Sequence, residues 1–104
     1  MKFRLAEEFK FANEGDAATL QVGSDSYPYT VIEVWKGGRQ IVLQACKTKP
    51  APGFDYYNNQ EYIIEPDPDG KKIKANFAPK RRRSYSDGTP VSIGRAHYYQ
   101  DPSF

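Results

Sequence analysis

The chain has 104 residues, of which 15 are Lys or Arg, 13 are Asp or Glu, and 14% are aromatic. A chain of this length forms one domain, residues 1–104, with a small core, because it buries only about two-thirds of its unfolded surface. No apolar run approaches the roughly 18 residues of a membrane span, and no secretory signal is recognisable. We therefore expect a cytoplasmic protein without membrane contact, whose aromatic, Pro and Gly content favours an all-β fold.

Turn-forming residues divide the first half of the chain into short elements. Gly37-Gly38 is a two-residue hairpin signal, because both positions of a type I′ turn need positive φ. The expected elements are a strand or short helix across the barrel at residues 1–13, a strand at 18–22, a loop at 23–26, and two paired strands at 29–36 and 39–47.

Alternation assigns the side chains of the strand at 29–36 to two faces. It predicts that Val31, Glu33 and Trp35 lie on one side, and that Thr30, Ile32 and Val34 lie on the other.

The second half begins with a long loop at 48–59, which is rich in aromatic residues and of a length that is often functional. The turn at 66–70 is expected to need Gly70 for positive φ. Alternation in 71–77 predicts Lys72 and Lys74 on the solvent face. The strands expected here are 60–65, 71–77, 81–85 and 90–93, with Ile73, Ala75 and Phe77 inward and Lys72, Lys74 and Asn76 outward.

About six short strands at roughly ten-residue spacing are typical of a small sandwich or barrel. We predict an all-β, strongly bent antiparallel meander that closes into an SH3-like barrel. An OB-like barrel is the second choice, weakened by the lack of a clear helix between the third and fourth strands.

A basic strip of seven cationic residues without any carboxylate lies between positions 71 and 83. It leaves 8 of the 15 cations for the rest of the chain, against all 13 carboxylates. Charge of one sign attracts anions, although a charged edge strand also protects against aggregation. Two neighbouring strands are expected to set like charges opposite one another, and a bound anion would relieve the repulsion. The strip consists of Lys71, Lys72, Lys74, Lys80, Arg81, Arg82 and Arg83.

Aromatic residues are expected in or beside loops, where they either cap the ends of the core or form a stacking surface. Base–aromatic stacking contributes about 1–3 kcal/mol per base. Basic strands combined with loop aromatics are typical of proteins that bind nucleotides or single-stranded nucleic acid. The aromatic set is Tyr27, Tyr29, Phe54, Tyr56, Tyr57, Tyr98 and Tyr99.

Residues 94–104 are too aromatic for a free end, so we expect this tail to dock, with Phe104 packed against the barrel. In an extended segment Arg95, His97 and Tyr99 share one face and project into a groove. The candidate ligand-binding residues are therefore Tyr27, Tyr29, Tyr56, Tyr57, Lys72, Lys74, Arg81, Arg82, Arg83, Arg95, His97 and Tyr99.

No constellation of residues predicts catalysis. The single cysteine, Cys46, is expected to be a small buried hydrophobe, and with the single histidine, His97, it forms neither a zinc site nor a catalytic pair. Asp67 and Asp69 lie in a turn that lacks the closing Glu of a calcium loop. Glu33 has no partner at a spacing that suits general acid–base chemistry. We predict a non-enzyme without metal or cofactor.

Six short motifs are spread over most of residues 15–104. They are Gly23-Ser24-Asp25-Ser26-Tyr27, Thr30-Val31-Ile32-Glu33-Val34, Ile41-Val42-Leu43-Gln44, Tyr62 through Asp67-Pro68-Asp69-Gly70, Val91-Ser92-Ile93-Gly94 and Asp101-Pro102-Ser103-Phe104. In these motifs the chain resembles a group of short proteins encoded by phages and prophages. It departs from them at Ser26, where many relatives have a basic residue. The resemblance implies a phage context, but no established activity.

Three functions remain open at this point. The first is a phage accessory protein in the cytoplasm of the infected host, which counters defence by sequestering a nucleotide signal or by inhibiting a host protein. The second is a DNA- or RNA-binding module, which would use the same cations along a nucleic-acid backbone. The third is a structural or assembly component of the virion.

Overall fold

Eight β-strands run through the part of the chain that the structure, a computed structural model, describes: residues 12–35, 39–78 and 83–102. No helix occurs within these ranges, which confirms the predicted all-β class. The strands are β1 (Ala17–Val22), β2 (Asp25–Trp35), β3 (Gln40–Ala45), β4 (Lys47–Pro50), β5 (Tyr62–Glu65), β6 (Lys72–Ala78), β7 (Arg83–Ser86) and β8 (Thr89–Ile93).

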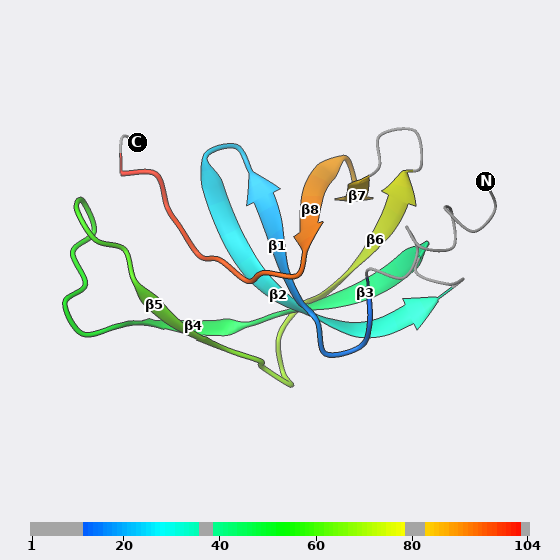
Figure 1. The fold of residues 1–104 in the computed structure, drawn as a ribbon, viewed down its shortest axis with the longest axis horizontal. Coiled ribbons are helices and arrows are strands. Elements are labelled where there is room, and N and C mark those ends of the chain that lie inside the picture. The colour runs from blue at the N-terminus through cyan, green and yellow to red at the C-terminus, as the bar shows by residue number, and fades with distance from the viewer. Residues whose placement is uncertain (1–11, 36–38, 79–82, 103–104) are drawn as a thin grey trace.

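Six of the strands form a closed barrel in the order β1-β2-β3-β6-β7-β8, and β8 pairs with β1 to complete it (Figure 1). Every neighbouring pair is antiparallel. The predicted antiparallel meander of about six strands is therefore confirmed, and its form is consistent with a small SH3-like or OB-like barrel. Closure leaves these six strands without a free edge.

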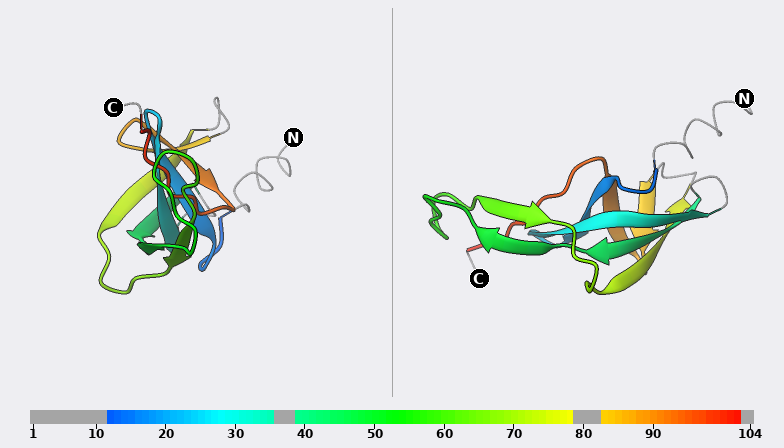
Figure 2. Two further views of the ribbon diagram at one scale, coloured as in Figure 1. Left: turned by 90° about the vertical axis from the view of Figure 1, so that its left-hand side faces the viewer. Right: turned by 90° about the horizontal axis from the view of Figure 1, so that it is seen from below.

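The remaining strands, β4 and β5, form a separate two-stranded sheet that we call the arm (residues 47–65). The arm is inserted between β3 and β6 and projects from one end of the barrel (Figures 1 and 2). The prediction of a loop at 48–59 is wrong for its first residues, because Thr48, Lys49 and Pro50 pair with β5. The strand was missed because these residues are polar and show no alternation of apolar and polar side chains. β4 is largely exposed and is held by backbone hydrogen bonds to β5.

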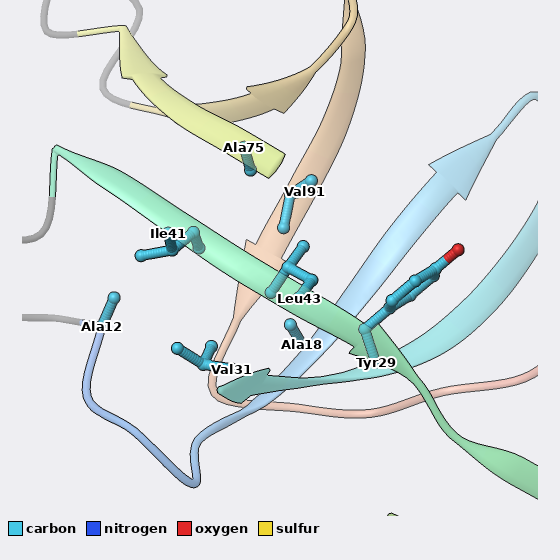
Figure 3. Close-up of a cluster of buried hydrophobic side chains, with 8 residues drawn as sticks. All are labelled: Ala12, Ala18, Tyr29, Val31, Ile41, Leu43, Ala75 and Val91. Atoms are coloured by element: carbon cyan, nitrogen blue, oxygen red, sulfur yellow. The ribbon is translucent and has the colours of Figure 1, made fainter. Parts of the chain in front are cut away.

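The core lies inside the barrel and is built from side chains of five strands together with Ala12 (Figure 3). Val31, Ile41, Leu43 and Val91 are almost completely buried. Each such side chain contributes roughly 1.5–3 kcal/mol by leaving water. The predicted alternation of β6 is also confirmed, since Ala75 and Phe77 are buried, Ile73 packs against the core, and Lys72, Lys74 and Asn76 are exposed.

A β-bulge interrupts β2 between Val31 and Glu33, where Ile32 is an extra residue in the pairing with β3. Val31 is buried, but Glu33 and Trp35 are exposed. The prediction that these three side chains share one face is therefore wrong. A bulge sets two residues against one on the partner strand and changes the side to which later side chains point.

Gly70 does not have positive φ, which contradicts its predicted role in the turn. A Cβ at this position would overlap the carbonyl oxygen of Ala45, so the glycine is needed for close backbone approach. The loop predicted at 23–26 is also shorter, because Asp25 already pairs with Val22.

Three predictions concern segments that lie wholly or partly outside the described residues. The strand or short helix predicted at 1–13 is described only at residues 12 and 13, and the predicted Gly37-Gly38 turn is not described. The pairing of Trp35 with Gln40 nevertheless confirms the hairpin to which that turn belongs. The strand predicted at 81–85 is described only from Arg83, as β7.

Candidate functional site

A groove of about 520 Å³ crosses the outer face of β2, β3 and β6, and we call it the outer groove. Cross-strand pairing builds it, because Glu33 stands opposite Val42, and Val42 stands opposite Lys74. Trp35 pairs with Gln40 in the next row. The lining residues are Glu33, Trp35, Gln40, Val42, Lys72, Ile73 and Lys74.

Trp35 is the aromatic member of the outer groove, and 54% of its surface is exposed. Its indole Nε1 donates a hydrogen bond to Oε1 of Glu33 at 3.0 Å. This bond holds the ring in a defined orientation beside Val42. A half-exposed indole that is held in this way offers a ring surface on which another planar group can stack.

The charges in the outer groove are separated along its width. Lys72 and Lys74 are exposed on β6, whereas Glu33 lies on β2 with β3 between them. Because neighbouring strands are about 4.8 Å apart, the backbones at Glu33 and Lys74 are on the order of 10 Å apart. The groove therefore has a cationic side and an anionic side, with the apolar Val42 between them.

A second hollow of about 290 Å³ adjoins the outer groove and shares Gln40 with it. Arg39, Asn76 and Phe77 complete its lining. Together the two hollows extend along β3 and β6, with Arg39 adding a cation at the far end.

The structure places the basic strip differently from the prediction. The residues of β6 opposite β7 are Asn76, Phe77 and Ala78, so Lys72 and Lys74 lie beyond the paired stretch. The expectation of like charges opposite one another is therefore wrong for these two lysines, which pair with Gln44 and Val42 of β3 instead.

The arginines of the basic strip are described only in part. Arg81 and Arg82 lie outside the described residues. Arg83 is placed by its backbone alone, opposite Ala78.

Tyr27 and Tyr29 both lie within β2, which begins at Asp25 and not at Tyr29 as predicted, so Tyr27 is a strand residue and not a loop residue. Tyr29 belongs to the core and is only 8% exposed, so its ring is not available to a ligand. Tyr27 is half-buried and begins a ladder of aromatic contacts that leads into the arm. Ring centroids are 5.9 Å apart for Tyr27 and Tyr98, 4.4 Å for Tyr98 and Tyr62, and 5.1 Å for Tyr62 and Phe54.

Burial raises the pKa of three of these tyrosines above the ordinary value of 10.0. For Tyr27 the carboxylate of Asp25 adds to the effect, and for Tyr62 the neighbouring Tyr98 does so. The shifts reflect the packing of phenols against one another and do not indicate a catalytic acid.

Tyr56 and Tyr57 lie in the connection between β4 and β5, and neither lines the outer groove. That connection is the end of the arm farthest from the barrel (Figure 1). Tyr57 is 73% exposed and packs edge-on against Tyr56, with centroids 5.1 Å apart. Hydrogen bonds from the Asn58 side chain and the Tyr57 backbone hold the pKa of Asp55 below its usual range, and they organise this loop.

The tail docks as predicted, by means of backbone and side-chain bonds. Ser26 and Tyr99 exchange two backbone hydrogen bonds, of 2.8 and 3.0 Å. The Gln60 side chain donates to the Gln100 carbonyl at 2.6 Å and accepts from its N–H at 3.0 Å, which ties the tail to the arm. The Asp101 N–H donates to Asp25 Oδ1 at 2.7 Å. The predicted packing of Phe104 lies outside the described residues.

Arg95 and His97 line a third, smaller hollow of about 230 Å³, on β1, β2 and β8. The rings of His97 and Tyr99 are nearly parallel, 9° between planes, with centroids 6.3 Å apart. Arg95 and His97 thus share a hollow, on a different part of the barrel wall from the outer groove, whereas Tyr99, predicted to project with them, does not line it. The other lining residues are Thr19, Gln21, Ser26 and Ser92.

Sequence reasoning missed Trp35, Glu33, Gln40 and Val42 as members of a site. One signal was present in the sequence. Val31 and Glu33 cannot both point into an apolar core without burying an unpaired carboxylate, which is strongly unfavourable. If Val31 is buried, as the structure shows, the alternation of β2 must be broken before Glu33, and this break exposes Trp35.

Cys46 is only partly buried, which corrects the expectation of a buried hydrophobe. Its Sγ lies 3.2 Å from Oγ1 of Thr30, because it occupies the single position between β3 and β4 where the chain leaves the barrel.

Within the described ranges, no group of three or more His, Cys, Asp or Glu side chains could hold a metal ion. The same part of the chain has no helix that is long and apolar enough to cross a membrane. Comparison of the chain with family models, with curated proteins and with solved structures finds no match.

Proposed function

We propose that this protein is a non-enzymatic binding protein that takes an anionic nucleotide in the outer groove. In this proposal the base stacks on Trp35, and the ammonium groups of Lys72 and Lys74 neutralise the phosphate. The observation that carries the proposal is that one groove of about 520 Å³ contains both a half-exposed indole and two exposed lysines.

An indole and two ammonium groups in one groove suit the two parts of a nucleotide, its base and its phosphate. Base–aromatic stacking contributes about 1–3 kcal/mol per base and tolerates any base. Hydrogen bonds between an ammonium and a phosphate are charge-assisted and roughly twice as strong as neutral ones. All these side chains stand on paired strands of a closed barrel, so their relative positions are held before a ligand arrives.

The resemblance to phage proteins suggests in which process a nucleotide-binding protein of this kind would act, namely the infection of a bacterial host. A small phage protein without catalytic groups acts stoichiometrically, and a nucleotide signal of host defence is a target that such binding would remove. Inhibition of a host protein through the same charged face is the corresponding alternative within this role.

A thermal-shift screen with cyclic and linear nucleotides, followed by calorimetric titration, tests the proposal. A ligand at 100 times its Kd raises the free energy of unfolding by about 2.7 kcal/mol. We expect Trp35→Ala to abolish most of the shift, whereas Tyr57→Ala, which removes an exposed aromatic ring from the arm, keeps it. If no nucleotide stabilises the protein, or if Tyr57→Ala removes the shift and Trp35→Ala keeps it, the outer groove is not the site.

Binding of single-stranded DNA or RNA is a second candidate, because the outer groove continues into the hollow that contains Arg39. A strand of several nucleotides could lie along β3 and β6. Affinity for an oligonucleotide would then fall steeply with salt, since each neutralised phosphate releases counterions. Replacing Lys72 and Lys74 together by Ala is expected to reduce the slope by about two. A salt-independent affinity would exclude this candidate.

A further inference from the structure

The two sides of the outer groove dictate how a nucleotide must lie in it. Its phosphate is repelled by the Glu33 carboxylate and attracted to Lys72 and Lys74, which are on the opposite side. The base is then left over Val42, against Trp35, with its edge toward Glu33. The charges of the groove therefore fix both the location and the direction of the ligand.

Glu33 can only accept hydrogen bonds, because an ionised carboxylate has about four lone-pair sites and no donor. The Trp35 indole occupies one of these sites on Oε1. Within residues 12–35, 39–78 and 83–102, the Trp35 indole is the group that donates to this carboxylate, at Oε1 and not at Oε2. The side chain therefore presents acceptors to the edge of the base, and the bond from the indole prevents it from rotating away.

We propose that the outer groove prefers guanine, an inference that rests on the proposed nucleotide-binding function. Guanine carries two adjacent donors on one edge, the N1–H and the exocyclic amine, which match the two oxygens of a carboxylate. Adenine and cytosine offer an amine next to a ring acceptor. Uracil offers a single N–H between two carbonyl oxygens, which repel Glu33. The expected order of affinity is guanine first, adenine and cytosine next, and uracil last.

Calorimetric titration of the full chain with GMP, IMP, AMP, CMP and UMP tests this order. A bidentate pair that is made by one base and not by another separates their affinities by about tenfold or more. We expect GMP to bind at least tenfold more tightly than UMP, and IMP, which lacks the exocyclic amine, to lose much of the preference. An oligouridine that carries one guanine, compared with plain oligouridine, shows whether the same preference holds within a strand.

Glu33→Gln provides the decisive variant, because the amide replaces one acceptor by a donor while keeping the size of the side chain. The preference for GMP over AMP is expected to be lost or reversed, whereas Glu65→Gln, an exposed change on the arm, leaves it intact. Because both positions are exposed, the melting temperature of each variant confirms that it is folded.

The outcomes separate this inference from the function on which it rests. If all five nucleotides bind equally and Trp35→Ala weakens them all, nucleotide binding stands and the preference for guanine is overturned. A preference for GMP that survives Glu33→Gln also overturns it. If no nucleotide or oligonucleotide binds, both the function and the inference are wrong.

Discussion

The indole of Trp35 donates to the carboxylate of Glu33, two residues earlier on the same strand, and both side chains face solvent. In a regular strand that buries Val31, the side chains of Glu33 and Trp35 would point into the barrel with it. The bulge at Ile32 changes the face to which the rest of β2 points, so that Val34 packs against the core instead. In this sequence the outer groove therefore depends on Ile32 being accommodated as a bulge.

Deleting Ile32 is expected to keep Glu33 and Trp35 on the outer face of the barrel. Without the extra residue, β2 alternates regularly from Val31 to Trp35 in the same register with β3, so the expected loss of stability is only that of one half-buried side chain, about 1–3 kcal/mol. Chemical denaturation monitored by Trp35 fluorescence measures the loss, and Ile32→Ala, which keeps the residue count, is the matched control. A much larger loss for the deletion, together with the emission of a buried indole, would contradict the assignment of Ile32 as the extra residue.

Tyr98→Ala is expected to lower the free energy of unfolding by about 1–3 kcal/mol. The change removes ring contacts with both Tyr27 and Tyr62, and each such pair contributes about 0.5–1.5 kcal/mol beyond its buried area. Urea denaturation provides the measurement. Tyr57→Ala deletes an equally large but exposed ring with a single ring contact, to Tyr56, and should change the stability by less than about 1 kcal/mol. Similar losses for both would show that the tail does not hold the arm.

Gly70→Ala is expected to cost about 1–3 kcal/mol, because its methyl group overlaps the Ala45 carbonyl where the end of the arm meets β3. Thermal unfolding of the variant measures the cost. Gly23→Asn is a suitable comparison, since φ at Gly23 is 60° and asparagine tolerates this conformation. A melting temperature for Gly70→Ala that equals that of the unmodified protein would mean that the backbone can separate here at no cost.

The free energy of unfolding is expected to decrease at high pH. The pKa values of Tyr27, Tyr29 and Tyr62 are raised in the folded state, so the folded protein retains phenolic protons that the unfolded chain has already lost. Their contribution is complete below the unfolded pKa of about 10 and is lost as the pH rises through the raised values. Denaturation curves between about pH 8 and pH 11 test this. Tyr27→Phe should reduce the slope, and a flat profile would contradict the shifts.

The regular parts of this fold could be predicted because a strand that is buried on one side alternates with a period of two. The pattern of Ala75, Phe77, Lys72 and Lys74 on β6 was correct for this reason. The bulge was missed because nothing in the residue types of β2 marks it. It changes only which residues of the later part of the strand point inward and which point outward. The pairing of β4 was missed because backbone bonds at an exposed position need no apolar pattern.

The candidate site was predicted only in part, for the same physical reasons. Lys72 and Lys74 follow directly from alternation. Which aromatic ring stands beside them depends on how the barrel closes and on the phase of β2, and these bring Trp35 to the groove while they place Tyr29 in the core. Likewise, the positive φ predicted for Gly70 was wrong, because the glycine is needed instead for close approach to the backbone of Ala45, which lies far away in sequence.

The arm and the outer groove are mechanically continuous. Only Cys46 separates β3 from β4, and the return into β6 is fastened by a bond from the Ala45 N–H to the Lys71 carbonyl and by Gln44, which donates to the carbonyls of Pro68 and Gly70. The arm is thus joined to the barrel by one residue on one side and by three hydrogen bonds on the other, at the ends of the two strands that present Val42, Lys72 and Lys74. A ligand that bound to the arm would therefore contact an element directly connected to the outer groove.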